Sequence, residues 1–241
     1  MEKLIYVLWR DPRVPQADFE KTLLSVAPPR LAAAGACGVQ VNLADASVAP
    51  AASLATQRSP VPVAGMLQLW LDSAHERVRR PVDALLQDLA GRSAGYLVSE
   101  SVVHRTQRWA PVPGQRTPGW SLVSLIERPA RLTYGAWLDV WQRFHVPIAI
   151  ATQSIHRRAE NLVIRALTPG APAYDAFVEE SFPDAAMDNP AIFFAAPGDP
   201  DRQAANSEMI MASCAGFLDF DRLDVVPMSH HTVGANWQGG P

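Results

Sequence analysis

The chain has 241 residues, of which 48% are hydrophobic and 19% are charged, and its formal net charge is −3. This hydrophobic content is sufficient for a core, so the composition excludes a chain that is disordered throughout. The small negative charge and the lack of a basic cluster argue against a partner nucleic acid, which needs clustered cations. No apolar run approaches the ~20 residues of a membrane helix, and the N-terminus does not resemble a signal peptide. We therefore expect a cytoplasmic protein with no membrane partner.

The sequence aligns with itself at an offset of about 118 positions. At this offset the apolar run 4–8 falls on 122–126, Phe19 falls on Trp137, and Leu23 falls on Trp141. Two tandem copies of one unit explain why the same order of elements occurs twice. We expect a degenerate first repeat at 1–109, a linker rich in Pro and Gly at 110–119, and a second repeat at 120–241 with an irregular tail.

In the first repeat, the expected order is strand, helix, strand, strand, helix, strand. Short apolar runs bounded by turn residues predict strands at 4–9, 39–43, 63–71 and 96–104. Apolar residues at helical spacing predict helices at 16–34 and 74–90. The stretch 48–62 is rich in Pro, Ala and Ser, which predicts a loop.

The second repeat has the same expected order. Its strands are predicted at 120–127, 157–166, 174–182 and 223–228, and its helices at 133–152 and 202–217. Thr133 is a candidate N-cap, because its hydroxyl can accept a hydrogen bond from an unpaired backbone amide. The chain from 230 onward is expected to be irregular.

Each βαββαβ unit has two helices on one face of an antiparallel sheet, which leaves the other face uncovered. We therefore expect an α+β fold in which two antiparallel sheets face each other as an α/β barrel within one chain. A homodimer of such chains is compatible with this arrangement.

Trp137, Trp141, His145, Pro147 and Ala149 follow a hydrophobic strand and a proline-containing turn. This pattern resembles the first strand and helix of the EthD-like family of dimeric α/β barrels, whose unit is ferredoxin-like. The resemblance covers nearly the whole chain as two tandem copies. It implies the fold but not the reaction, because the superfamily includes cyclases, cofactor-free monooxygenases, dehydratases, decarboxylases, haem enzymes and proteins without known activity.

The match is better in the second repeat. Segments 158–161 and 175–182 resemble later strands of the family. In the first repeat, Leu23 stands at the position of Trp141 and Ala27 at the position of His145, so this repeat has lost the signature.

His145 is the main candidate for acid–base catalysis, because an imidazole exchanges protons near neutral pH. The alternative is a histidine at a helix end that binds carbonyl groups left without a partner by Pro147. Asn161 and Arg165 alternate with more apolar residues on a strand, so we expect both to point into the barrel and polarise a substrate oxygen. The alternative for Asn161 is a structural role, which its repeat Asn42 supports.

Adjacent residues on a strand face opposite sides, so only one of Glu179 and Glu180 can face a cavity; we assign Glu179 to substrate binding. Trp120, Trp141 and Tyr174 are expected to line a pocket for an aromatic ligand, although most aromatic side chains serve the core. His156 lies beside two arginines and is a candidate for binding an anion, with an exposed loop as the alternative.

No metal site and no cofactor are expected. Cys37 and Cys214 are far apart in the sequence, and the adjacent pair His230 and His231 would point in opposite directions on an extended segment. The sequence also lacks the glycine-rich nucleotide motifs and the zinc-protease and serine-hydrolase motifs.

These observations favour a cofactor-independent lyase-type enzyme that acts on a small aromatic or polyketide-like molecule. Its chemistry would be dehydration, decarboxylation, deformylation or cyclisation by proton transfer. The alternatives are a cofactor-free monooxygenase and a non-catalytic barrel that binds small molecules or serves in stress.

Overall fold

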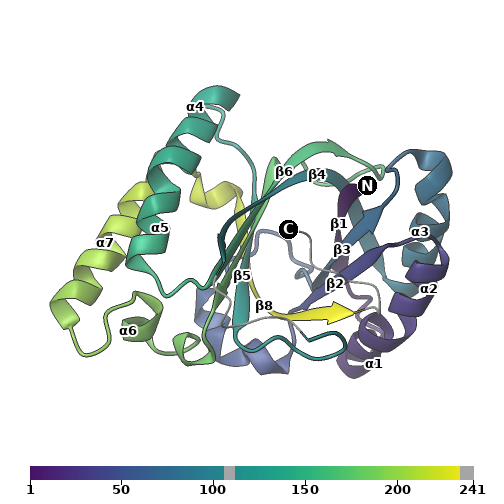
Figure 1. The fold of residues 1–241 in the computed structure, drawn as a ribbon, viewed down its shortest axis with the longest axis horizontal. Helices are drawn as coiled ribbons and strands as arrows, with labels where there is room; N and C mark the ends of the chain where they lie inside the picture. The colour runs from purple at the N-terminus through teal and green to yellow at the C-terminus, as the bar shows by residue number, and fades with distance from the viewer. Residues whose placement is uncertain (106–111, 234–241) are drawn as a thin grey trace.

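The computed structural model describes residues 1–105 and 112–233, and the strands in these residues form one closed antiparallel barrel (Figure 1). Its strands are β1 (Glu2–Trp9), β2 (Gly38–Leu43), β3 (Gly65–Leu71), β4 (Arg92–Arg105), β5 (Trp120–Ile126), β6 (Arg157–Ala166), β7 (Ala176–Phe182) and β8 (Leu223–Val233). Their order around the barrel is β1-β3-β2-β8-β5-β7-β6-β4. The predicted α+β barrel is therefore confirmed.

The two sheets are not separate layers that face each other, as the sequence had suggested. They are joined edge to edge, because β2 pairs with β8 and β4 pairs with β6. With these two pairings, each of the eight described strands pairs with a neighbour on both sides. The expected division at 110–119 stays a prediction, and part of that segment lies outside the described residues.

We define the two halves as β1 to β4 and β5 to β8. The main helices follow the same order in both, whereas η2 occurs only in the first half and η5, α6 and η6 only in the second. The first half contains α1 (Gln16–Lys21), η1 (Thr22–Val26), α2 (Ala27–Ala33), η2 (Ala46–Leu54) and α3 (Glu76–Leu89). The second half contains α4 (Tyr134–Leu138), η4 (Asp139–His145), α5 (Val146–Thr152), η5 (Asp184–Ala186), α6 (Pro190–Phe193), α7 (Pro200–Phe217) and η6 (Phe220–Arg222). The helices of each half cover the outer face of its own strands (Figure 1).

The first helix of each half is interrupted at the same place. The π-helical segments η1 and η4 end just before Pro28 and Pro147, respectively. A proline has no amide hydrogen to donate within the helix, so the preceding turn widens. Thr133 caps the second of these helices, since its Oγ1 accepts a hydrogen bond from the Ala136 amide at 3.3 Å, as predicted.

Two expectations about irregular segments are wrong. The loop predicted at 48–62 is wrong for its first part, since residues 46–54 form the 3-10 helix η2; Asp45 caps its start, and Val48 and Ala51 are buried against the second half. Residues 55–62 contain no helix and no named strand. Strand β8 continues to Val233, since its last residues pair with β2. The expected tail beyond 233 lies outside the described residues.

The barrel interior contains an apolar centre and a polar end. The apolar cluster combines residues of both halves, including Ile5, Val7, Val123, Phe177 and Met228. At the ends of the same strands, alternation brings polar side chains inward. Those that are buried are Lys3, Gln40, Asn42, Gln68, Ser121, Glu179, Ser181 and His230.

Glu179 lies at the centre of this polar end and contacts both halves. Its carboxylate accepts hydrogen bonds from Gln68 Nε2 at 2.7 Å and Gln40 Nε2 at 3.1 Å, both in the first half. In the second half it accepts a hydrogen bond from Ser121 Oγ at 3.2 Å and pairs with Arg157 Nη1 at 3.0 Å. Burial opposes ionisation, but Arg157 and the other partners outweigh it and lower the pKa of Glu179 to about 2.

We predict that Glu179→Gln lowers the free energy of unfolding by about 3 kcal/mol, because it removes the buried charge that pairs with Arg157 and accepts hydrogen bonds from Gln40 and Gln68. Chemical denaturation at pH 7 measures this loss. Glu208→Gln on the exposed surface of α7 is the matched control and should change stability by less than about 0.5 kcal/mol. Equal stabilities of the two variants would show that Glu179 does not hold the halves together.

Candidate active site

A cavity of about 330 Å³ lies between the outer face of the second half's strands and its helices. We call it the helix–sheet cavity. Its walls are mainly apolar and aromatic, with a few ionisable groups. The residues that line it are Leu54, Thr56, Leu122, Ser124, Ile126, Trp141, His145, Gln153, Arg158, Val178, Glu180, Phe193, Phe194, Ile210, Met211, Cys214, Phe217, Leu218, Phe220, Leu223 and Val225.

Strand alternation decides which side chains reach this cavity. On β5 and β7, Ser124 and Glu180 point outward toward the helices, whereas their neighbours Val123 and Glu179 point into the barrel. The first half closes one side of the cavity with the segment after η2. Thr56 forms a backbone bridge with Val225 of β8, with N–O distances of 2.9 and 2.6 Å.

His145 enters the cavity from the helix layer. The widened turn of η4 buries its side chain to 5% exposure, while the adjacent Phe144 remains 58% exposed. His145 Nδ1 shares a hydrogen bond of 2.6 Å with Ser213 Oγ on α7, and the ring lies 4.6 Å from the ring of Phe217. Burial, together with the charge of Arg158, lowers the pKa of His145 to about 3. The imidazole is therefore neutral at pH 7.

Glu180 enters the cavity from the sheet. It forms an ion pair with Arg158, whose Nε also donates to Glu160 Oε1 at 3.0 Å. Burial raises the pKa of Glu180, and the charge of Glu160 adds to this effect, while Arg158 opposes it. Arg158 is thus shared by two carboxyl groups, and the pKa of Glu180 lies above its ordinary value.

Cys214 lies beside His145 but is poorly suited to act as a nucleophile. Its Sγ is 3.9 Å from His145 Nδ1. Burial raises the pKa of this thiol to about 12, so it stays protonated at neutral pH. The cavity therefore offers two groups for proton transfer, a neutral imidazole on the helix wall and a protonatable carboxyl on the sheet wall.

The structure brings together only part of the site expected from the sequence. His145 and Trp141 line the helix–sheet cavity. Asn161 points into the barrel as expected, where its Nδ2 donates to the Phe177 carbonyl at 3.3 Å, but this is the opposite face of the sheet from His145. Arg165 is exposed, so the expectation that it points into the barrel is wrong. A register shift of the β4–β6 pairing, between Leu97 and Val98, falls at this position and breaks the alternation.

The four remaining candidates also lie outside the cavity. Trp120 stacks on Phe182 in the core, with 5.2 Å between the ring centroids. Tyr174 belongs to the apolar cluster of the barrel interior, and its hydroxyl donates to Asp224 Oδ2 at 2.8 Å. Glu179 belongs to the polar end of the barrel. His156 is buried rather than placed on an exposed loop, and burial lowers its pKa to about 4.

Sequence reasoning missed the most important group on the sheet wall. From the sequence, either Glu179 or Glu180 could face a cavity, and the prediction chose Glu179. Arg158 was noted only because segment 158–161 resembles a strand of the family. Arg158 and Glu160 are two residues apart on a strand and so share one face, and Arg158 pairs with Glu180 on the next strand. These opposite charges on one face could have indicated a buried charge cluster. The aromatic wall supplied by α6 and α7 had no such signal, because it depends on helix packing.

The described residues offer no clear metal site. Within 1–105 and 112–233, no three His, Cys, Asp or Glu side chains are grouped closely enough to hold a metal ion. In the same residues, none of the helices combines the length and apolarity needed to cross a bilayer.

Comparisons with known proteins identify the fold. Residues 130–221 match the family model of the EthD domain. A crystal structure described as "anthrone oxidase-like protein" is similar over 99% of this chain and 96% of its own, with a TM-score of 0.55 and 10% identity. A "Putative monooxygenase" from Fusobacterium nucleatum subsp. nucleatum ATCC 25586 is similar over 99% of this chain and 95% of its own, with a TM-score of 0.51 and 8% identity. No curated protein matches the sequence.

We predict that His145 makes the protein less stable as the pH falls below about 6.5. In the unfolded chain His145 has its ordinary pKa of 6.5, whereas in the folded chain its pKa is about 3. Between these two values the unfolded chain binds a proton that the folded chain does not, so the free energy of unfolding falls as the pH falls. Between pH 7 and 4, the wild type should lose about 3 kcal/mol more unfolding free energy than His145→Gln. Denaturation at several pH values measures this difference.

The other histidines with lowered pKa, His156, His230 and His231, are present in both proteins and cancel in the comparison. Parallel pH profiles for the two proteins would contradict a neutral, buried His145.

Proposed function

We propose that this chain, which matches the EthD domain model at residues 130–221 and has the fold of a dimeric α/β barrel, is a cofactor-independent, lyase-type enzyme that uses the helix–sheet cavity as its active site. The observation that carries the proposal is the placement of Glu180 and His145 on opposite walls of one apolar cavity. Groups whose burial shifts their pKa are frequent in active sites, since proton transfer needs such tuning.

The walls favour a small aromatic substrate. Trp141, Phe193 and Phe217 provide flat apolar surface, and a volume of about 330 Å³ suits a molecule of one or two rings. Few polar groups interrupt these walls, so a ligand is oriented chiefly by Glu180, His145 and Arg158. This chemistry fits the aromatic or polyketide-like class that the sequence favours.

In the proposed mechanism, the neutral His145 is the base, and the negative charge that develops on the substrate stabilises its imidazolium against the burial and the Arg158 charge that otherwise lower its pKa. When Nδ1 donates to Ser213 Oγ, Nε2 carries the free lone pair and takes a proton from an activated carbon or hydroxyl of the substrate. Glu180 in its protonated form donates to the oxygen on which negative charge develops. Dehydration and cyclisation begin with such a transfer, whereas decarboxylation and deformylation end with delivery of a proton to the carbon that has lost the group.

A cofactor-free monooxygenase is the second candidate. The same base would deprotonate a phenol-like substrate. The resulting anion would supply the electrons that reduce dioxygen, so that one oxygen atom enters the substrate and the other leaves as water. The description of the Fusobacterium nucleatum structure favours this reaction, although the similarity extends only to the fold.

A non-catalytic barrel would bind ligands in the cavity without any proton transfer.

Ser124 should control whether the cavity accepts a ligand, because its small side chain lies on the sheet wall opposite the helices. We predict that aromatic ligands which bind the wild type raise its melting temperature by about 5 °C or more at 100-fold excess over Kd. Ser124→Phe fills the cavity and should abolish this shift, whereas Ser124→Ala should preserve it. A ligand that stabilises all three proteins equally binds elsewhere.

Proton transfer can be tested before the overall reaction is known. A ligand found by thermal shift is incubated with the protein in D2O, and exchange of its acidic carbon-bound hydrogens is followed by NMR. We predict that Glu180→Gln and His145→Gln each slow this exchange by about 100-fold or more, since each removes one partner in the transfer. Glu208→Gln is the control and should exchange like the wild type.

Oxygen uptake separates the two enzyme classes. A lyase consumes no dioxygen during turnover, whereas a monooxygenase consumes one molecule per substrate. A ligand that binds in the cavity but shows neither exchange nor turnover would favour the non-catalytic barrel.

A further inference from the structure

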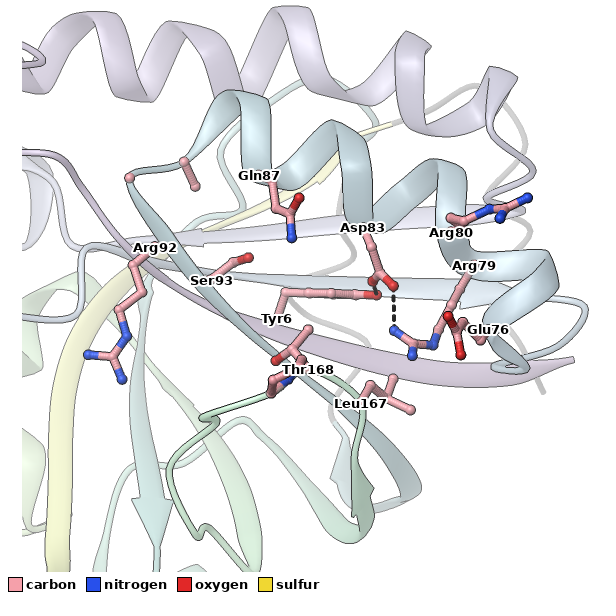
Figure 2. Close-up of a pocket in the computed structure, with 13 residues that line it drawn as sticks. Tyr6, Glu76, Arg79, Arg80, Asp83, Gln87, Arg92, Ser93, Leu167 and Thr168 are labelled. Atoms are coloured by element: carbon pink, nitrogen blue, oxygen red, sulfur yellow. Dashed lines mark hydrogen bonds and ion pairs between the residues drawn. The ribbon is translucent and has the colours of Figure 1, made fainter.

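The first half has its own pocket at the position that corresponds to the helix–sheet cavity. This pocket has a volume of about 470 Å³ and lies between α3, the start of β4 and Tyr6 of β1 (Figure 2). We call it the first-half cleft. The helix–sheet cavity likewise lies between α7, the start of β8 and Ser124 of β5. At the offset of the repeat, Tyr6 is the counterpart of Ser124.

Each pocket is completed by the opposite half. The segment that follows β6 lies across the first-half cleft, where the Leu167 amide donates to the Gly95 carbonyl at 2.7 Å. The Gly95 amide in turn donates to Thr168 Oγ1 at 3.0 Å. Thr56, which follows β2 and η2, bridges to Val225 in the corresponding way at the helix–sheet cavity. The first-half cleft is therefore a feature of the shared architecture.

The first-half cleft differs from its counterpart in chemistry. Tyr6 donates its hydroxyl to Asp83 Oδ1 at 2.7 Å, and Arg79 pairs with the other oxygen of Asp83 (Figure 2). Burial raises the pKa of Tyr6, so the phenol remains a neutral donor. Asp83 is thus satisfied by partners within the protein.

Arg79 has donors that Asp83 does not use. Its side chain is only 9% exposed, and its buried Nε lacks a hydrogen-bond partner in the described part of the chain. The Nε is shielded from solvent, so a ligand reaches Arg79 through the part of its guanidinium that stays exposed.

The net charge of the lining is positive. It contains the guanidinium groups of Arg79, Arg80 and Arg92 against the carboxylates of Glu76 and Asp83. Arg80 and Arg92 lie toward opposite ends of the cleft (Figure 2). Within residues 1–105 and 112–233, neither of these two forms an ion pair with a carboxylate, but the Arg92 guanidinium lies over the ring of Trp9, 4.2 Å from its centroid.

We propose that the first-half cleft binds a small organic carboxylate, with its carboxylate group at Arg79. A guanidinium offers a planar fork that matches the two oxygens of a carboxylate. Thr168 contributes a hydroxyl from the second half, so the bound ligand contacts both halves. The two pockets of the protein therefore bind different classes of ligand, one anionic and one aromatic.

Calorimetric titration with benzoate tests the proposal, with uncharged benzamide and inorganic phosphate as further probes. Benzoate should bind the wild type, and benzamide should bind at least about tenfold more weakly because it lacks the charge. Phosphate that binds while benzoate does not would overturn the carboxylate assignment. Absence of benzoate binding would overturn the proposal.

Matched variants locate the bound benzoate. Arg79→Gln combined with Asp83→Asn removes both charges of the buried pair, and should weaken benzoate binding by about tenfold or more. Arg77→Gln, an exposed change on the same helix, should leave it unchanged. Ser124→Phe blocks the helix–sheet cavity and should also leave it unchanged, so this result does not depend on the function proposed above. Loss of binding in Ser124→Phe alone would place benzoate in the other cavity.

Photolabelling of the wild type with 4-azidobenzoate provides a second measurement that does not require the double variant to fold. Peptide mapping should find the label within residues 76–93. Labelling confined to 141–158 or 210–218 would contradict the proposal.

Discussion

The closure of one barrel by strands from both halves is the constraint on which the rest of the structure depends. A sheet covered by helices on one face has an apolar second face, and neither half can bury that face alone. Pairing of β2 with β8 and of β4 with β6 solves this problem and removes the strand edges at the same time. Glu179 then accepts hydrogen bonds from both halves inside the barrel, where strand alternation places it.

This closure also determines where ligands can bind. The middle of the barrel is filled by interlocking apolar side chains, so its centre is core and not a binding site. The helix–sheet cavity and the first-half cleft both lie outside the barrel, between sheet and helices, and each is closed by a segment of the opposite half. A ligand in either pocket therefore contacts a surface that exists only when the halves are joined.

The chemical difference between the pockets follows from a few substitutions at equivalent positions. The Tyr6 ring lies against Gly95. A Cβ atom added at Gly95 would be 2.6 Å from this ring, so the tyrosine fits only because residue 95 has no side chain. In the second half, Ser124 pairs with Val225 and leaves space for an apolar cavity. His145 stands in this half alone, since its counterpart is Ala27.

The order of elements, the barrel class and the EthD-like helix were all predictable from the sequence, because periodicity and the repeat are local or one-dimensional signals. The candidate site was predictable only for His145 and Trp141, which share one helix. The face on which Glu180 lies, the exposure of Arg165, and the partnership of His145 with Ser213 were decided by strand register and helix packing. A shift of one residue in a strand reverses the direction of every side chain, and only the paired barrel sets that register.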